Sequence, residues 1–97
     1  MPGHPDPRLN LAIALERGGQ IEDAILAYEG VLEMRPELDA AMVGLAAVQL
    51  KHRRADERTA EILGKIARSS TSVEVKEWAL SQRAILNSAD EPLLSQE

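Results

Sequence analysis

A dipeptide that recurs at a fixed interval constrains the fold of this chain more than any other feature. Leu11-Ala12 returns as Leu45-Ala46, 34 residues further along. Self-similarity with a period of about 20–50 residues is typical of arrays in which each repeat is one small unit of secondary structure. The interval therefore predicts a fold built from repeated pairs of elements, stacked on one another.

Residues that begin and end helices divide the chain into five expected helices. Asp6 is placed to cap a helix that starts at Pro7, because the first helical position needs no backbone N–H. Gly18-Gly19 ends that helix. Thr71, three residues before Glu74, fits a capping box for the last helix. The five helices are expected over about residues 7–17, 21–35, 38–51, 56–68 and 73–88.

Apolar residues recur at helical spacing through these segments, and no segment alternates with the period of two that strands require. In the first helix the residues at this spacing include Leu11 and Leu15, and in the fifth Trp78 and Ile85. Aromatic residues make up 2% of the chain, so the core must be built from Leu, Ile, Val, Met and Ala. Straight-chain and small residues favour helices, whereas strands prefer aromatic and β-branched ones. The expected fold class is all-α, with five helices joined by short turns that make neighbours antiparallel.

Charge and composition exclude several classes of function. The formal net charge of −5 argues against nucleic acid and an anionic membrane surface as partners, because both need a basic field. The one basic cluster in the sequence, Lys51, Arg53 and Arg54, is offset by Asp56 and Glu57. The absence of cysteine excludes disulfides and thiolate sites. No apolar run approaches the roughly 18 residues of a membrane span, and residues 1–5 lack the pattern of a secretory signal, so a cytoplasmic location is expected.

The first repeat resembles the tetratricopeptide family, whose pattern is W-x2-L-G-x2-Y, then Gly, then A-x3-F-x2-A, then Pro. The matching positions are Leu11, Ala12, Leu15, Gly18, Gly19, Ala24, Tyr28, Val31 and Pro36. Small residues in such a pattern let two helices approach closely, and a bulky residue one turn later fills the gap. The resemblance implies antiparallel helix-turn-helix repeats that form a short right-handed superhelix.

The second repeat departs from the family pattern. Leu45-Ala46 fits, but the series Ala60, Gly64, Ala67 fits only if the turn has two extra residues, and no terminal proline follows. Trp78 could hold the family's Trp position, but the residues after it match poorly, so the last helix is interpreted as a capping helix. A generic five-helix bundle is the alternative. The expected divisions are a flexible arm at 1–5, repeat one at 6–38, a degenerate repeat two at 39–72, a capping helix at 73–88 and a tail at 89–97.

The resemblance also implies that the first helix of each pair lines a concave groove that binds a partner. The groove positions map to Asp6, Leu9, Ile13, Glu16 and Arg17 in repeat one, to Ala40, Val43, Ala47, Leu50 and Lys51 in repeat two, and to Lys76, Leu80 and Arg83 on the last helix. The ten of these that are expected to bind the partner are Leu9, Ile13, Glu16, Arg17, Val43, Ala47, Leu50, Lys51, Lys76 and Leu80. Leu9 and Ile13 lie off the Leu11/Leu15 stripe, which gives one helix two apolar faces where a surface helix usually needs one. The alternative is that the second face packs on the neighbouring repeat. Some family members clamp a peptide carboxylate with Lys and Asn. Those positions hold Leu9, Ile13 and Gly44 here, so that activity is not implied.

The residues that could carry chemistry lack the surroundings that chemistry requires. His52 and Asp56 could share a metal ion, but structural zinc usually takes four ligands and these are two on a turn. Gly18-Gly19-Gln20 copies the tripeptide of peptide-release factors, yet it falls where the repeat needs a turn. No motif places a base beside the Ser69–Ser72 run, which helix capping explains. We therefore expect no catalytic activity, no metal and no cofactor.

Two functions from different classes fit these expectations. The first is a non-catalytic module that binds a peptide or protein segment in the groove, where apolar walls would suit a short amphipathic helix or an extended apolar segment. The second is self-association as a homodimer or assembly scaffold. About three repeats are normally needed for a stable array, and only two and a cap are visible, so the open end must be covered. An enzyme would need a deep polar pocket with a perturbed titrating group.

Overall fold

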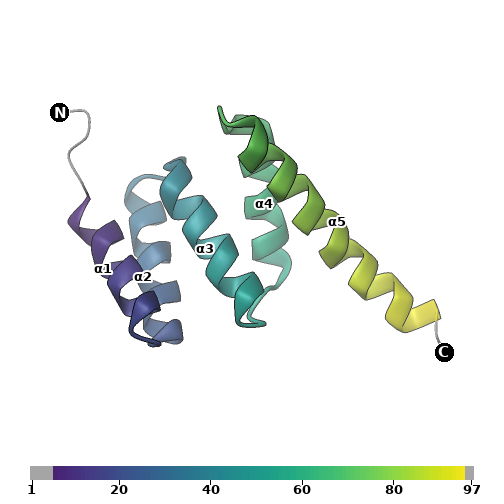
Figure 1. Ribbon diagram of the computed structural model, residues 1–97, viewed down its shortest axis with the longest axis horizontal. Helices are drawn as coiled ribbons and strands as arrows, with labels where there is room; N and C mark the ends of the chain where they lie inside the picture. The colour runs from purple at the N-terminus through teal and green to yellow at the C-terminus, as the bar shows by residue number, and fades with distance from the viewer. Residues whose placement is uncertain (1–5, 96–97) are drawn as a thin grey trace. The chain divides into compact units, whose positions relative to one another are not determined.

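The computed structural model describes the backbone of residues 6–95 and the side chains of residues 6–86, and all its regular elements are α-helices (Figure 1). The expected arm at 1–5 and the last two residues of the expected tail lie outside the described residues. The helices are α1 (Pro7–Arg17), α2 (Ile21–Met34), α3 (Asp39–Lys51), α4 (Glu57–Ser69) and α5 (Val73–Ser95). The predicted all-α class with five helices is confirmed.

The chain divides into two compact units. Unit 1 is Met1–Ala55 and contains α1 to α3, whereas unit 2 is Asp56–Glu97 and contains α4 and α5. In unit 1, α1 packs on α2, α2 packs on α3, and α1 also contacts α3, so that α1 and α3 lie in front of α2 in Figure 1. In unit 2, α4 packs along α5. The boundary between the units falls inside the expected second repeat, and the pairing of α3 with α4 as one repeat stays a prediction.

The helix α1 starts at Pro7 with Asp6 as its N-cap, as the sequence predicts. A carboxylate oxygen of Asp6 accepts a hydrogen bond from the backbone N–H of Arg8 at 2.9 Å, and Pro7 occupies the first turn. The other oxygen of Asp6 lies 3.5 Å from a guanidinium nitrogen of Arg35, just after α2. That ion pair is partly exposed and is worth little, so the cap is the main contribution of Asp6.

The turn after α1 is a Schellman motif. The N–H of Gly19 donates to the carbonyl of Glu16 at 3.1 Å, and the N–H of Gln20 donates to that of Leu15 at 2.9 Å. Gly19 has a φ of 84°, in the left-handed region that glycine adopts without strain. Gly18-Gly19 therefore ends the helix through the backbone freedom of its second member.

The turn after α3 repeats this geometry, 34 residues later. The N–H of Arg53 donates to the carbonyl of Leu50 at 3.4 Å, and the N–H of Arg54 donates to that of Gln49 at 2.7 Å. Arg53 has a φ of 59°, so an arginine holds the left-handed position that Gly19 holds in the first turn. The period of the sequence is thus also a period of the backbone, although only the first turn has the glycine that favours it.

Exchanging the residues at these two positions should change stability in opposite directions. Arg53→Gly is expected to raise the free energy of unfolding by about 0.5–1 kcal/mol, and Gly19→Ala to lower it by about 1 kcal/mol, because a β-carbon is strained at positive φ. Gly18→Ala is the matched control: its φ is −80°, and a β-carbon there would meet nothing closer than 3.4 Å. Urea unfolding followed by circular dichroism measures all three. A loss of stability in Arg53→Gly would contradict the assignment of strain to Arg53.

Small side chains are buried where helices approach one another. Ala12, Ala24 and Ala46 are 0% exposed, and all three hold small-residue positions of the tetratricopeptide pattern. The larger core residues of unit 1 are Ile25, Tyr28, Val31, Met42, Leu45 and Val48. Those of unit 2 are Thr59, Ile62, Leu63 and Ile66. Apolar residues at helical spacing on α2 thus supply much of the core of unit 1.

Two large residues of the expected apolar stripes are exposed. Leu11 is 55% exposed and Ile85 is 56% exposed. The buried face of α1 centres on Ala12, and the α2 residues nearest to Leu11, Ala27 and Gly30, are too small to cover it. On α5 only Ala79 is fully buried among the described side chains, because within unit 2 a single helix, α4, packs against α5. Trp78, also on α5, is partly exposed for the same reason.

Side chains cap both helices of unit 2, and one of these caps differs from the expected residue. The carboxylate of Asp56 accepts from the N–H groups of Arg58 and Thr59, and the Thr59 hydroxyl accepts from the N–H of Asp56, which makes a capping box for α4. For α5 the expected cap, Thr71, is wrong by one residue. The hydroxyl of Ser72 accepts from the N–H of Val75 at 3.2 Å instead.

The helix α5 is longer than expected, because it continues to Ser95 where a tail was expected from Ala89 onward. No glycine interrupts residues 73–95. Pro92 removes a single backbone donor from the helix and does not end it in the structure. Composition indicated a tail, but it contained no residue that requires the helix to stop.

Candidate functional site

The ten groove residues expected to bind the partner fall into two sets, since the chain forms two units. Lys76 and Leu80 lie on α5 of unit 2, where Leu80 is 53% exposed and Lys76 is partly exposed. The other eight lie on α1 and α3 of unit 1. They are Leu9, Ile13, Glu16, Arg17, Val43, Ala47, Leu50 and Lys51. Unit 1 therefore brings together most of the candidate site.

These eight residues form two matching stripes. Each stripe follows the spacing i, i+4, i+7, i+8, which places its members on one face of a helix. The aliphatic members are partly exposed, and the cations that end the stripes, Arg17 and Lys51, are exposed. The two helices that bear the stripes contact each other. Unit 1 thus has apolar side chains on two contacting helices that its own core does not fully bury.

Glu16, the acidic member of the α1 stripe, is engaged inside unit 1. Its Oε1 accepts a hydrogen bond from the hydroxyl of Tyr28 at 2.9 Å. Tyr28 is 2% exposed, and this burial, then the hydrogen bond to Glu16 and the negative charge of that residue, raise the pKa of Tyr28, while Arg17 lowers it more weakly. Tyr28 therefore remains a neutral donor, and Glu16 offers a partner only the remainder of its carboxylate.

The ring of Tyr28 also sets how closely α3 approaches. A β-carbon on Gly44 would lie 2.7 Å from Cζ and 3.0 Å from the hydroxyl oxygen of Tyr28, so only a glycine fits there. Gly44 faces this ring, although the resemblance maps it to the position of the carboxylate clamp. One side chain of α2 thus touches α1 and α3 and holds the two stripes at a fixed separation.

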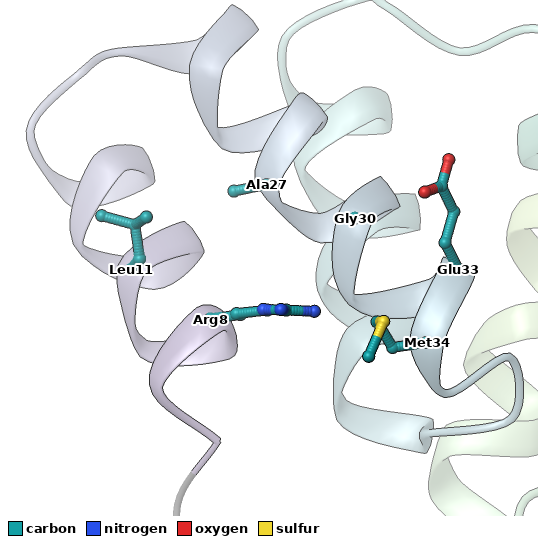
Figure 2. Close-up of a pocket in the computed structure, with 6 residues that line it drawn as sticks. All are labelled: Arg8, Leu11, Ala27, Gly30, Glu33 and Met34. Carbon is teal, nitrogen blue, oxygen red and sulfur yellow. The ribbon is translucent and has the colours of Figure 1, made fainter.

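A second surface of unit 1 is more exposed than the stripes. Leu11 is 55% and Met34 65% exposed, and with Ala27 and Gly30 they line a shallow hollow of about 270 Å³ between α1 and α2 (Figure 2). We call this surface, with Arg8 and Glu33 at its rim, the outer patch. The sequence pattern does not predict this surface, because Leu11 falls on an apolar stripe of the first helix. Leu26, Gly30 and Met34 lie four residues apart along α2, and this spacing was the available signal of a shared helix face.

The rim of the outer patch has charges of both signs. Figure 2 shows Arg8 extending from α1 toward α2, whereas the carboxylate of Glu33 points away from it. Neither side chain forms an ion pair in the described part of the chain. An apolar hollow with one cation and one anion at its edge has the composition of a small docking surface.

The basic residues are grouped differently from the expectation. In unit 1, Arg54 of the expected cluster pairs with Glu22 on α2, with Nε 2.5 Å from Oε2. In unit 2, Lys65 and Arg68 of α4 meet Arg83 of α5, a cluster that sequence analysis missed because its members come from two helices. The expectation of one basic cluster in the chain is therefore wrong.

The remaining candidates are the residues considered for a metal site and the helices considered for a membrane span. Among residues 6–86, no three His, Asp or Glu side chains are grouped to hold a metal ion. Asp56, considered above as a metal ligand, uses its carboxylate to cap α4. In the described part of the chain, none of the helices has both the length and the apolar character needed to cross a membrane.

Comparison with known protein families, curated proteins and solved structures finds no match to this chain. The likeness to tetratricopeptide repeats therefore depends on the residues and geometry described above. Those are the 34-residue period, the buried small residues and the repeated turn.

Proposed function

We propose that the chain is a non-catalytic module that binds a segment of another protein, and that the two stripes of unit 1 form the binding surface. The observation that carries the proposal is the partial exposure of apolar side chains on contacting helices, at positions that repeat after 34 residues. They are Leu9 and Ile13 on α1, and Val43, Ala47 and Leu50 on α3. Exposing these aligned apolar groups to water does not stabilise a monomer, whereas covering them with a partner makes the free energy of binding more favourable.

The geometry of unit 1 supports a tetratricopeptide-like repeat as the scaffold of this surface. The helix α1 contacts both its partner α2 and the next helix α3, as the first helices of successive repeats must. Ala12, Ala24 and Ala46 are buried at the close approaches, and Gly19 and Arg53 hold equivalent turns. A binding surface on such a scaffold is rigid, because Tyr28 connects the three helices.

The chemistry of the stripes suggests the kind of partner. Their aliphatic members would take an apolar segment, such as the hydrophobic side of a short helix. Arg17 and Lys51 are exposed at the same end of both stripes, while Glu16 is hydrogen-bonded to Tyr28. We infer a segment with apolar residues followed by acidic ones. We propose the cytoplasm as the place where this binding occurs.

The test is capture of a partner by the tagged chain with Leu9→Asp and Ile13→Asp combined. Each Asp places a charge on the stripe, where it would be desolvated by a bound apolar segment, so capture should fall at least about tenfold. A photo-crosslinking residue at Ala47 then identifies the partner segment by mass spectrometry. Leu26→Asp is the matched control, because Leu26 is 64% exposed on α2 and lies on neither stripe.

Circular dichroism and thermal unfolding must show that the double variant keeps its helices. Folded protein with undiminished capture would contradict the stripes as the binding surface. Equal loss of capture in Leu26→Asp would contradict them as well, because it would show that any added charge on unit 1 is sufficient.

A second candidate function, self-association, is favoured by the outer patch. Leu11 and Met34 are the exposed apolar residues of its hollow, and Arg8 and Glu33 are charges of opposite sign. In a two-fold dimer the same patch meets itself, so that Arg8 of one copy can face Glu33 of the other. Light scattering after size exclusion separates the two functions. A dimer that dissociates in Leu11→Asp supports self-association, and a monomer at all concentrations contradicts it.

A further inference from the structure

The basic cluster of unit 2 surrounds a glycine. Gly64 on α4 is buried, and the position that its β-carbon would take lies 3.5 Å from Nη1 of Arg68 and 3.5 Å from Nη1 of Arg83. The two guanidinium nitrogens are therefore no further from each other than twice that distance. Like charges so close repel each other, and this arrangement is stabilised when an anion lies between them.

The surroundings of these two arginines form a pocket with a net positive charge. It has a volume of about 380 Å³ between α4 and α5, and its lining includes Lys65 and Glu61 as well as both arginines. Among the described residues of the lining, three cations and one carboxylate leave a net charge of two positive units. No residue in the described part of the chain forms an ion pair with Arg68, Arg83 or Lys65. This charge stands out in a chain whose formal net charge is −5.

We propose that this pocket binds the dianionic phosphate group of a phosphate monoester or of inorganic phosphate. A phosphate group has a charge of about −1.5 to −2 at neutral pH, which matches the uncompensated charge of the lining. Two guanidinium groups from different helices provide forked donors for its oxygens, and Lys65 adds a point charge. The absence of a side chain at Gly64 lets both guanidinium groups lie close to the α4 backbone, beside the pocket.

Stabilisation by the helix dipole explains only part of the cluster. Lys65 and Arg68 lie in the second half of α4, and Arg68 is in its last turn, where a cation is favoured by the helix dipole. Arg83 comes from α5 and has no such reason to lie over Gly64 beside another arginine. The convergence of Arg83 on Arg68 is therefore the observation that points to a ligand. It is independent of the stripes of unit 1.

The experiment is an NMR titration of the ¹⁵N-labelled full chain with inorganic phosphate, and separately with a phosphoserine peptide. The amide of Gly64 and the Nε–H groups of Arg68 and Arg83 should shift to saturation with either ligand. Chloride at matched ionic strength should produce no saturable shift. Tighter binding of the peptide would identify a phosphorylated protein as the source of the group, and equal binding would identify free phosphate.

Three variants are expected to differ in their effect on phosphate affinity. Arg83→Gln should weaken phosphate binding about tenfold, because one charge-assisted donor pair is lost. Glu61→Gln should strengthen it several-fold, since it removes the one carboxylate among the described residues of the lining. Arg53→Gln, the same change in unit 1, should have no effect. The proposal is overturned if phosphate gives no saturable shift, or if Arg53→Gln weakens binding as much as Arg83→Gln.

Discussion

Gly44→Ala is expected to lower the free energy of unfolding of unit 1 by about 1–3 kcal/mol. Two effects oppose each other at this position. Alanine is favoured over glycine inside a helix by about 1 kcal/mol. The added β-carbon would nevertheless lie 2.7 Å from Cζ of Tyr28, a buried ring whose hydroxyl is held by Glu16, so the ring cannot move aside without breaking that hydrogen bond. The steric term should therefore prevail.

Gly30→Ala is the matched control, because Gly30 is also inside a helix and a β-carbon there would meet nothing within 4 Å. It should raise stability by about 0.5–1 kcal/mol, the helix propensity term alone. Urea unfolding of both variants measures the difference. If the contact with Tyr28 is the cause, Tyr28→Leu should reduce the effect of Gly44→Ala in a double-mutant cycle. Gly44→Ala and Gly30→Ala with equal stability would contradict the close packing at Gly44.

The protein is expected to lose stability steeply as the pH rises above about 10, through Tyr28. Burial and the carboxylate of Glu16 raise the pKa of this phenol in the folded chain above its ordinary value of 10.0. Above that value the unfolded chain releases the proton and the folded chain keeps it, so the unfolded state is favoured increasingly as pH rises. Below it both states are protonated, and the contribution of Tyr28 to stability is complete.

Tyr28→Phe isolates this effect from the titration of lysines. At about pH 8 the variant should be less stable than the original chain by about 0.5–1.5 kcal/mol, the contribution of one hydrogen bond. At about pH 11 the difference should shrink or reverse, because phenylalanine has no proton to lose. Urea unfolding at both pH values measures it. A constant difference between the two chains would show that Tyr28 ionises in the folded state as it does in the unfolded one.

The helices could be predicted where the sequence contains residues that act locally. Asp6, Gly19 and Pro36 define ends of α1 and α2, and the structure places those ends within a residue of expectation. The cap of α5 and its length were wrong. Ser72 and Thr71 have the same capping chemistry, and the turn that the Ser70 hydroxyl makes with the N–H of Ser72 decides between them. No local residue stops α5 at Ala89.

The sites were less predictable, because they depend on which helices meet. The two stripes of unit 1 follow from helical spacing, since each lies on a single helix. The exposure of Leu11 depends on the small size of Ala27 and Gly30 opposite, and the pocket at Gly64 depends on an arginine from another helix. The hydrogen bond between Tyr28 and Glu16 joins residues 12 apart in the sequence, which no pattern along one helix contains.

The two aromatic residues of the chain lie one in each unit, Tyr28 in unit 1 and Trp78 in unit 2. Each unit therefore has a single intrinsic chromophore with its own optical signal. Indole emission, excited where phenol does not absorb, reports only on the surroundings of α5. Phenol absorbance overlaps that of indole, so the difference between the original chain and Tyr28→Phe isolates the signal from the junction of the first three helices. The folding of either half can be followed in the unlabelled protein.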